Sequence, residues 1–244
     1  LLSRRQRQMC IRDRYQDSYD KGDRTMKYEA IRKTVLEAIL EAVEKGLING
    51  TSGNIAMRDS EDRNIVAITP SGISYTGMKP EDIAIVERKE DGTNEWIDGN
   101  YKPSSEVPMN TEVMRRRPDV NATVHTHSMY ATICAMGENP ELKPITPPQC
   151  EFTPVEIVSF TMPGSNDVAA KVADKIGENG RVCLIKNHGM FSCGKDMKGA
   201  MHATVYTEEM AQTTVIAKTL GNYDPMPQEA VEKMQALIAA DQAV

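Results

Sequence analysis

Apolar residues recur along most of the chain at the spacings of helices and strands. From Tyr28 to Val43 they follow one another every three or four residues, and Gly46 provides a stop, so this pattern predicts a helix. Three short runs rich in β-branched residues come next, separated by turns of Gly, Pro, Ser and Asn, and they predict the start of a sheet. These runs are 54–57, 65–69 and 83–87.

The second half of the chain combines helical and extended patterns in an irregular order. The pattern predicts helices over 108–116, 129–136, 167–176 and 197–220, and strands over 121–127 and 182–186. A short connection containing prolines then leads into a terminal amphipathic helix. Since no linker or internal repeat divides the chain, we expect a single α/β domain of the α+β type, with a central, mainly antiparallel sheet flanked by helices.

The first residues differ from the rest. Segment 1–14 contains five arginines and one aspartate and has almost no apolar periodicity. It resembles the translated sequencing adapters that precede some conceptual translations, so residues 1–25 are predicted to be a non-native or disordered extension, with Met26 as the natural start. A functional basic arm is the alternative. The predicted organisation is completed by a domain over 26–221 and a helical tail over 222–244.

Composition narrows the class of protein. The 244 residues are 40 % hydrophobic and 26 % charged, which suits one substantial core, and no run approaches the roughly 18 apolar residues of a membrane span. The net charge of −6 and the lack of a basic stripe argue against a nucleic-acid partner. Five cysteines without CxxC spacing are typical of a reducing compartment, so we expect a cytoplasmic protein whose thiols pack as small apolar groups.

Three of the four histidines lie at the ends of predicted strands. His125 and His127 are two residues apart, a spacing that puts both imidazoles on one face of a strand, and His188 follows the apolar strand 182–186. Three imidazoles with an open fourth position are the usual ligand set of catalytic zinc. An accidental pair on a polar edge is the alternative for His125 and His127. His202, on a predicted helix, is expected to be a packed or surface residue.

Other polar residues suit chemistry beside such a metal. Glu106 precedes a helix, where a carboxylate can simply favour the helix N-terminus next to a capping Ser104 or Ser105. It can also remove a proton from a carbon whose enediolate oxygens a metal stabilises. Three turns rich in glycine and small hydroxyl residues, 51–54, 69–72 and 104–105, offer donors that suit a phosphate, although each is also an ordinary turn.

In this order, the motifs resemble those of the class II aldolase and adducin N-terminal family, most closely its L-fuculose-1-phosphate aldolase-like members. The resemblance runs from about residue 26 to 221 and rests on six ordered motifs. They are Thr51-Ser52-Gly53-Asn54-Ile55, Ile68-Thr69-Pro70-Ser71-Gly72, Pro103-Ser104-Ser105-Glu106, Val124-His125-Thr126-His127, Tyr130-Ala131-Thr132 and Asn187-His188-Gly189.

The resemblance implies a role for each matching residue. His125, His127 and His188 would bind one Zn²⁺ per subunit, or another divalent metal. Glu106 would be the catalytic acid and base, and would lie close to the metal when substrate is absent. The residues implied to hold the substrate phosphate are Gly53, Asn54, Ser71, Gly72, Ser104 and Ser105. Tyr130, in a separate motif, is expected to serve packing.

The implied activity is reversible cleavage of a phosphorylated ketose, such as L-fuculose 1-phosphate, to dihydroxyacetone phosphate and a small aldehyde. The family usually forms homotetramers with active sites at subunit boundaries. Fuculose-phosphate aldolases also have two tyrosines that reach a neighbouring subunit's site. A rough alignment places Leu237 at one of these positions and finds no tyrosine near Pro147 at the other, so the proton donor to the aldehyde is unassigned.

Other activities of the family stay open. Pentulose-phosphate 4-epimerases resemble this chain but have aspartate at the position of Glu106, so the glutamate favours an aldolase. A methylthioribulose-1-phosphate dehydratase has the same metal ligands and is harder to exclude. An adducin-like interaction domain is not catalytic, and such a scaffold has no need for three histidines together with Glu106.

Overall fold

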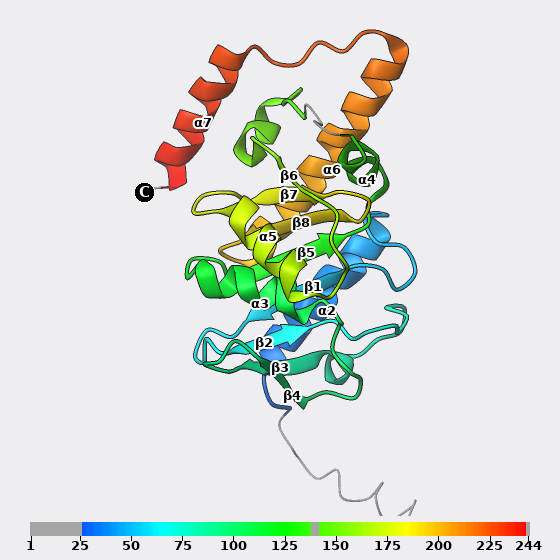
Figure 1. The fold of residues 1–244 in the computed structure, drawn as a ribbon, viewed down its shortest axis with the longest axis vertical. Helices are drawn as coiled ribbons and strands as arrows, with labels where there is room; N and C mark the ends of the chain where they lie inside the picture. Colours follow the sequence, from blue (N-terminus) through cyan, green and yellow to red (C-terminus); the bar gives the residue numbers. More distant parts are fainter. Residues whose placement is uncertain (1–25, 138–141, 243–244) are drawn as a thin grey trace, which may run out of the picture.

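The computed structural model describes residues 26–137 and 142–242, so the predicted extension 1–25 lies outside the described residues. Eight strands form its centre. They are β1 (Asn54–Arg58), β2 (Ile65–Ile68), β3 (Ala84–Arg88), β4 (Asn94–Asp98), β5 (Ala122–Thr126), β6 (Glu156–Val158), β7 (Val182–Ile185) and β8 (Gly189–Gly194). They make one sheet in the order β4-β3-β2-β1-β5-β8-β7-β6, drawn from bottom to top in Figure 1. Neighbouring strands are antiparallel except β6 and β7, which are parallel.

Helices connect the strands and cover both faces. The α-helices of the described residues are α2 (Glu29–Glu44), α3 (Val107–Arg116), α4 (Met129–Ala135), α5 (Asn166–Ile176), α6 (Met197–Leu220) and α7 (Gln228–Gln242). Two 3₁₀-helices are η1 (Pro80–Asp82) and η2 (Pro147–Phe152). The predicted helices of the domain begin and end within about two residues of the observed ones, since caps such as Ser165 and Asp196 stand where their side chains accept a hydrogen bond from the first turn.

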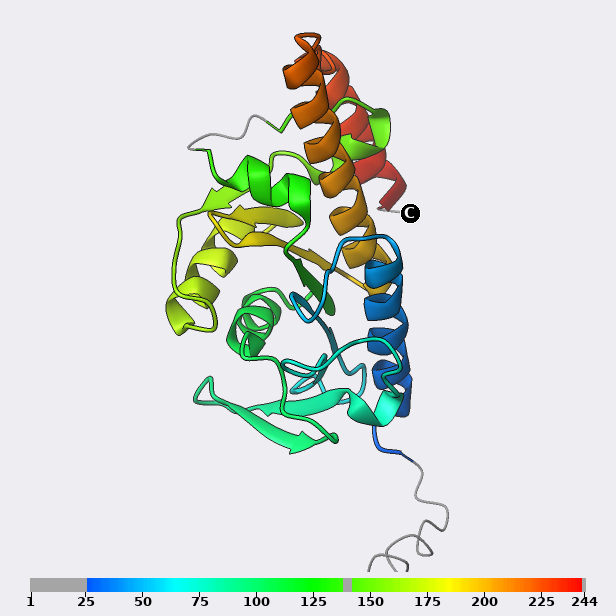
Figure 2. The ribbon, with the colours of Figure 1, turned by 90° about the vertical axis from the view of Figure 1, so that its right-hand side faces the viewer.

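The sheet lies between two helical layers. Figure 2 shows α2 and α6 on one side of it, and α3 and α5 on the other. Alternate strand residues supply the two cores: Ile55 and Ile85 pack in the cluster with α2, whereas Ala56 and Val86 pack in the cluster with α3 and α5. The expected α+β fold with a central, mainly antiparallel sheet is therefore confirmed.

Three strands, β4, β6 and β8, have no counterpart among the predicted ones. β4 forms an edge of the sheet and most of its residues are exposed, so it lacks an apolar pattern. β8 is buried along its whole length, and its small residues do not alternate between apolar and polar. β6 has only three residues.

The C-terminal segment packs on η2. Val231 of α7 is buried, and Gln235 Nε2 donates to the backbone oxygens of Cys150 (3.1 Å) and Thr153 (2.9 Å). Among the described residues, every helix is too short or too polar to pass through a bilayer.

Candidate metal centre

The three histidines reach one place from the end of strand β5 and from the hairpin that joins β7 to β8. His125 lies on β5 opposite Asn54 of β1, on the face that α3 covers, because its neighbour Val124 points to the α2 side. His127 follows the last residue of β5, and His188 lies in the short connection between β7 and β8. In that connection Asn187 adopts a left-handed conformation, with a φ of 55°, that asparagine tolerates better than most residues.

The imidazole nitrogens are spaced as ligands of one ion would be. The Nε2 atoms of His125 and His127 are 3.1 Å apart, and one ligand atom from each of the three histidines and Glu106 lies within 4.8 Å of the others. Two nitrogens bound tetrahedrally to zinc lie roughly 3.3 Å apart, given bonds of roughly 2.0–2.1 Å. The spacing therefore fits a divalent metal.

The hydrogen bonds of the group favour the same interpretation. His125 Nδ1 lies 2.9 Å from the carbonyl oxygen of Met190, which can only accept, so Nδ1 carries the hydrogen and the Nε2 lone pair faces the group. Glu106 Oε1 is buried and accepts no hydrogen bond, and His188 Nε2 lies 3.3 Å from it. A buried carboxylate oxygen without a donor is stabilised by a cation. The residues present thus fit a bound metal ion.

Electrostatics keep the ligands in their metal-binding forms. Burial, together with the neighbouring rings of His125 and His188, lowers the pKa of His127 to about 4. Burial alone would raise the pKa of Glu106, but the neighbouring rings of His125 and His188 hold it below its ordinary value. At neutral pH the group therefore offers a free imidazole and an ionised carboxylate.

Glu106 occupies the first position before α3, and the expected serine cap is not formed. The helix begins at Val107 with Glu106 as its N-cap residue, and no side chain caps it. Ser104 Oγ instead accepts a hydrogen bond from the Glu106 N–H at 3.2 Å. Because Glu106 stands outside the first helical turn, its side chain is free to turn toward the histidines.

The three turns predicted to suit a phosphate, 51–54, 69–72 and 104–105, lie next to one another. Pro70 and Pro103 form an isolated antiparallel bridge, and the N–H groups of Ser71 and Ser104 donate to the other segment's backbone at 2.9 and 3.1 Å. Thr69 also contacts β1 directly after the first turn, since its N–H donates to Ile55 O at 3.1 Å. The structure thus places the segments that carry the three turns next to one another.

Two of these residues have a structural role that the sequence does not show. Gly53 has a φ of +88°, and a Cβ there would lie 2.6 Å from the carbonyl oxygen of His125, so only glycine lets the turn approach β5. The Asn54 side chain donates from Nδ2 to Glu106 Oε2 at 2.9 Å. It therefore contacts the proposed catalytic carboxylate.

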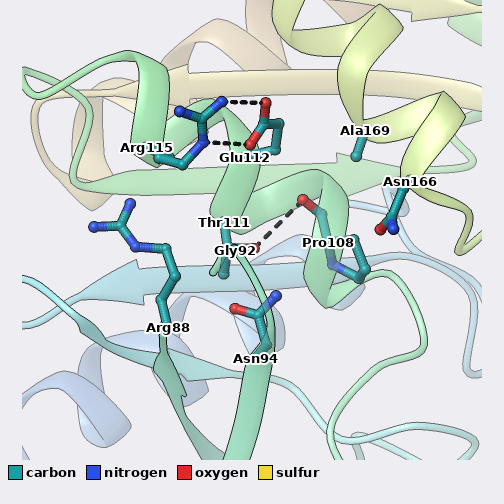
Figure 3. Close-up of a pocket in the computed structure, with 9 residues that line it drawn as sticks. All are labelled: Arg88, Gly92, Asn94, Pro108, Thr111, Glu112, Arg115, Asn166 and Ala169. Atoms are coloured by element: carbon teal, nitrogen blue, oxygen red, sulfur yellow. Dashed lines mark hydrogen bonds and ion pairs between the residues drawn. The ribbon is translucent and has the colours of Figure 1, made fainter. Parts of the chain in front are cut away.

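Other candidate residues lie away from this group. His202 is exposed on α6, as a surface histidine would be, and Tyr130 is partly buried against the core cluster of α4 and α6. A separate pocket of about 190 Å³ lies between α3, the β3–β4 hairpin and the start of α5, and Glu112 pairs with Arg115 at its edge (Figure 3). Its lining includes neither Glu106 nor a histidine. The chemistry therefore concentrates at the histidine group.

The family assignment follows from comparison with known proteins. The profile of the Class II Aldolase and Adducin N-terminal domain matches residues 33–215. The chain belongs to this family. The resemblance to this family that the sequence motifs indicated is therefore confirmed.

Relatives and solved structures agree with the assignment. A 5-deoxy-D-ribulose 1-phosphate aldolase of Bacillus thuringiensis serovar kurstaki is 34 % identical over 79 % of this chain and 87 % of its own length. A 5-methylthioribulose-1-phosphate/5-deoxyribulose-1-phosphate aldolase of Rhodospirillum rubrum is 28 % identical, covering 84 % and 89 %. The solved structure of an L-fuculose 1-phosphate aldolase shares the fold, with a TM-score of 0.75, 24 % identity and coverage of 89 % and 100 %. The predicted enzyme class, an aldolase and hence a lyase, is confirmed.

Proposed function

We propose that this class II aldolase cleaves a ketose 1-phosphate, of the L-fuculose 1-phosphate kind, to dihydroxyacetone phosphate and a small aldehyde. One observation carries the proposal: Glu106 lies within a group of three histidines that fits a divalent cation, beside three turns suited to a phosphate. The two relatives named above are called aldolases of other ketose 1-phosphates. Their names support the position of the phosphate and the type of bond cleaved.

In this proposal the turns hold one end of the substrate. The N–H groups of Ser71 and Ser104 already pair the two segments with each other. We therefore assign phosphate binding to the hydroxyl groups of these turns and to the N–H groups of Gly72 and Ser105. Fixing the phosphate holds the reacting carbons against the histidine group, which lowers the entropic part of the barrier.

Glu106 would move the proton in this reaction. A divalent metal held by His125, His127 and His188, which we propose to be zinc, supplies Lewis-acid stabilisation of the negative charge that develops on the donor's oxygens. Glu106 lies next to all three rings, so its carboxylate can take a proton from the carbon beside the carbonyl, or return one to it.

A panel of substrates tests this function. Purified protein, reconstituted with zinc, should release dihydroxyacetone phosphate from at least one of L-fuculose 1-phosphate, 5-deoxyribulose 1-phosphate and 5-methylthioribulose 1-phosphate. Release is measured by coupled NADH oxidation, with the unphosphorylated ketoses as controls. Loss of water from 5-methylthioribulose 1-phosphate without triose release would identify a dehydratase, and interconversion of pentulose phosphates would identify an epimerase. Either result contradicts the proposal.

We also propose assembly into a homotetramer with active sites at subunit boundaries. Exposed apolar residues lie in the part of the chain between His127 and His188. Met129 and Met136 are on or next to α4, and Phe160 and Met162 are in the segment whose Gly164 approaches Ser105. Such residues are typical of surfaces buried by association. Light scattering coupled to size-exclusion chromatography should give four chains per particle, and a monomer would contradict the assembly.

A further inference from the structure

Two buried polar side chains, Asn110 and Thr123, lie behind the proposed catalytic carboxylate. Thr123 is on β5, two residues before His125, and Asn110 is on α3, one turn after Glu106. Both are fully buried. They line the same side of the sheet as the apolar core under α3 and α5, where a polar group is stable only when its hydrogen bonds are made.

These side chains form one continuous chain of hydrogen bonds that ends on Glu106. The Thr123 hydroxyl donates to Asn110 Oδ1 at 2.7 Å, and Asn110 Nδ2 donates to Asn54 Oδ1 at 2.8 Å. Asn54 Nδ2 then donates to Glu106 Oε2 at 2.9 Å. Asn110 Nδ2 also donates to the backbone oxygen of Glu106 at 2.9 Å. Every link passes from donor to acceptor in the same direction.

The chemistry of the amides fixes that direction. Asn110 faces two oxygens, the side-chain oxygen of Asn54 and the backbone oxygen of Glu106, so its NH₂ group must point at them. The Thr123 hydroxyl satisfies the Asn110 oxygen left on the other side. With its own oxygen occupied, Asn54 can offer only its NH₂ group to Glu106. The orientation of the carboxylate thus depends on Asn110 and Thr123, although neither side chain is hydrogen-bonded to the carboxylate itself.

We infer that Asn110 and Thr123 are positioning residues for Glu106, an inference that rests on the proposed function for its catalytic meaning. Through Asn54 they hold Oε2 as a hydrogen-bond acceptor and leave Oε1, which accepts no hydrogen bond, turned toward His188. Oε1 is then the oxygen available for proton transfer and for a metal ion. Fixing one oxygen limits rotation of the carboxylate and so keeps the other in place.

Thr111 provides a matched control on the same helix. It is also buried, but its hydroxyl donates to the backbone oxygen of Val107 at 3.0 Å and has no link to Asn54 or to the Glu106 carboxylate. Thr111→Val and Thr123→Val therefore each replace one buried hydroxyl by a methyl group. Only the second change breaks the hydrogen-bond chain.

The test compares Thr123→Val, Thr123→Ser and Thr111→Val with the unchanged protein, and adds Asn110→Leu where it folds. We expect Thr123→Val to weaken zinc binding, measured by competition with a chelator, and to lower kcat about ten-fold or more with little change in KM. Thr123→Ser, which keeps the hydroxyl, should restore both. Thr111→Val should match the unchanged protein in both, and thermal unfolding should show that the two valine variants are similarly stable.

Each outcome has a definite meaning. Equal zinc affinity and equal kcat for Thr123→Val and Thr111→Val would overturn the inference while leaving the proposed function intact. If the unchanged protein cleaves none of the ketose phosphates, kcat cannot be measured, and the inference is tested by zinc affinity alone. A selective loss in Thr123→Val then supports the positioning of Glu106 although the proposed function fails, and equal affinities overturn the positioning as well.

Discussion

Among the described carboxylates, Glu106 is distinguished by where its charge lies. It is nearly buried, its two oxygens face different histidines, and an asparagine orients it. Several other acidic side chains form exposed ion pairs, such as Glu29 with Lys33, which contribute little to stability. A buried carboxylate among histidines is typical of a functional site and not of a side chain that only stabilises the fold.

Replacing Glu106 by glutamine should therefore stop proton transfer without unfolding the protein. The amide keeps the size of the side chain but cannot take up a proton at neutral pH. We expect kcat to fall by about 10²–10⁴-fold. Exchange of the donor's C–H proton in ²H₂O, followed by NMR on dihydroxyacetone phosphate, should cease. Glu112→Gln, on the same helix, is the control, and undiminished exchange in Glu106→Gln would count against this residue as the base.

Replacing a histidine of the group should remove the metal. His127→Ala is the informative change because this ring is exposed, so its loss leaves the core intact. We expect metal content, measured by atomic emission, to fall from one ion per chain to well below one, with His125→Ala giving the same result. His202→Ala, also exposed but on α6, should keep its ion. Full metal content in both site variants would exclude the assigned ligands.

At the scale of elements, local patterns predicted helices and the histidine pair well, but not the contacts that join distant segments. The two-residue spacing of His125 and His127 depends only on strand geometry, so the sequence suffices. The contact between Asn54 and Glu106 depends on the register of β1 with β5 and on where α3 begins, which involve residues about fifty positions apart. Convergence of the three turns likewise needs the Pro70 bridge, which no spacing reveals.

The hairpin that presents His188 depends on Gly189. A Cβ at this position would lie 2.1 Å from the backbone oxygen of Thr126, so the end of β8 would have to move away from β5. We expect Gly189→Ala to lower the free energy of unfolding by about 1–3 kcal/mol, measured with urea, and to weaken metal binding as well.

Gly46→Ala is the control for this hairpin. Gly46 also has a positive φ, but a Cβ there would meet open space. It should lose some stability from backbone strain and keep its metal affinity. If both variants retain metal equally, the close packing of Gly189 is not what places His188.

At the scale of the whole molecule, the site is built on the sheet and the terminal helix lies apart from it. α7 packs on η2, far along the chain from the histidine motifs, and covers Cys150, whose thiol is buried beside Met226. Cys183 and Cys193 are buried in the sheet, and none of the described cysteines forms a disulfide, in accordance with thiols that act as small apolar groups.

Ending the chain at Gly221 should therefore preserve the site and uncover one thiol. Burial raises the pKa of Cys150, and removing residues 222–244 ends that burial. We expect one additional fast-reacting thiol with a disulfide reagent at pH 8, a lower melting temperature and an unchanged metal content. Cys183, fully enclosed by the sheet and α5, should stay unreactive. Loss of the metal would show that the predicted boundary between domain and tail divides a single unit.

The ligand group also bears on which ion the protein acquires in a cell. Nitrogen and oxygen donors such as these bind the first-row divalent ions in a fixed order of strength, rising from manganese to copper and falling again at zinc. The exposed ring of His127 gives competing ions an approach from solvent. The ion that accompanies the purified protein will therefore record the supply of trace elements in the growth medium, and loading with a chosen ion is the first step of any measurement of catalysis.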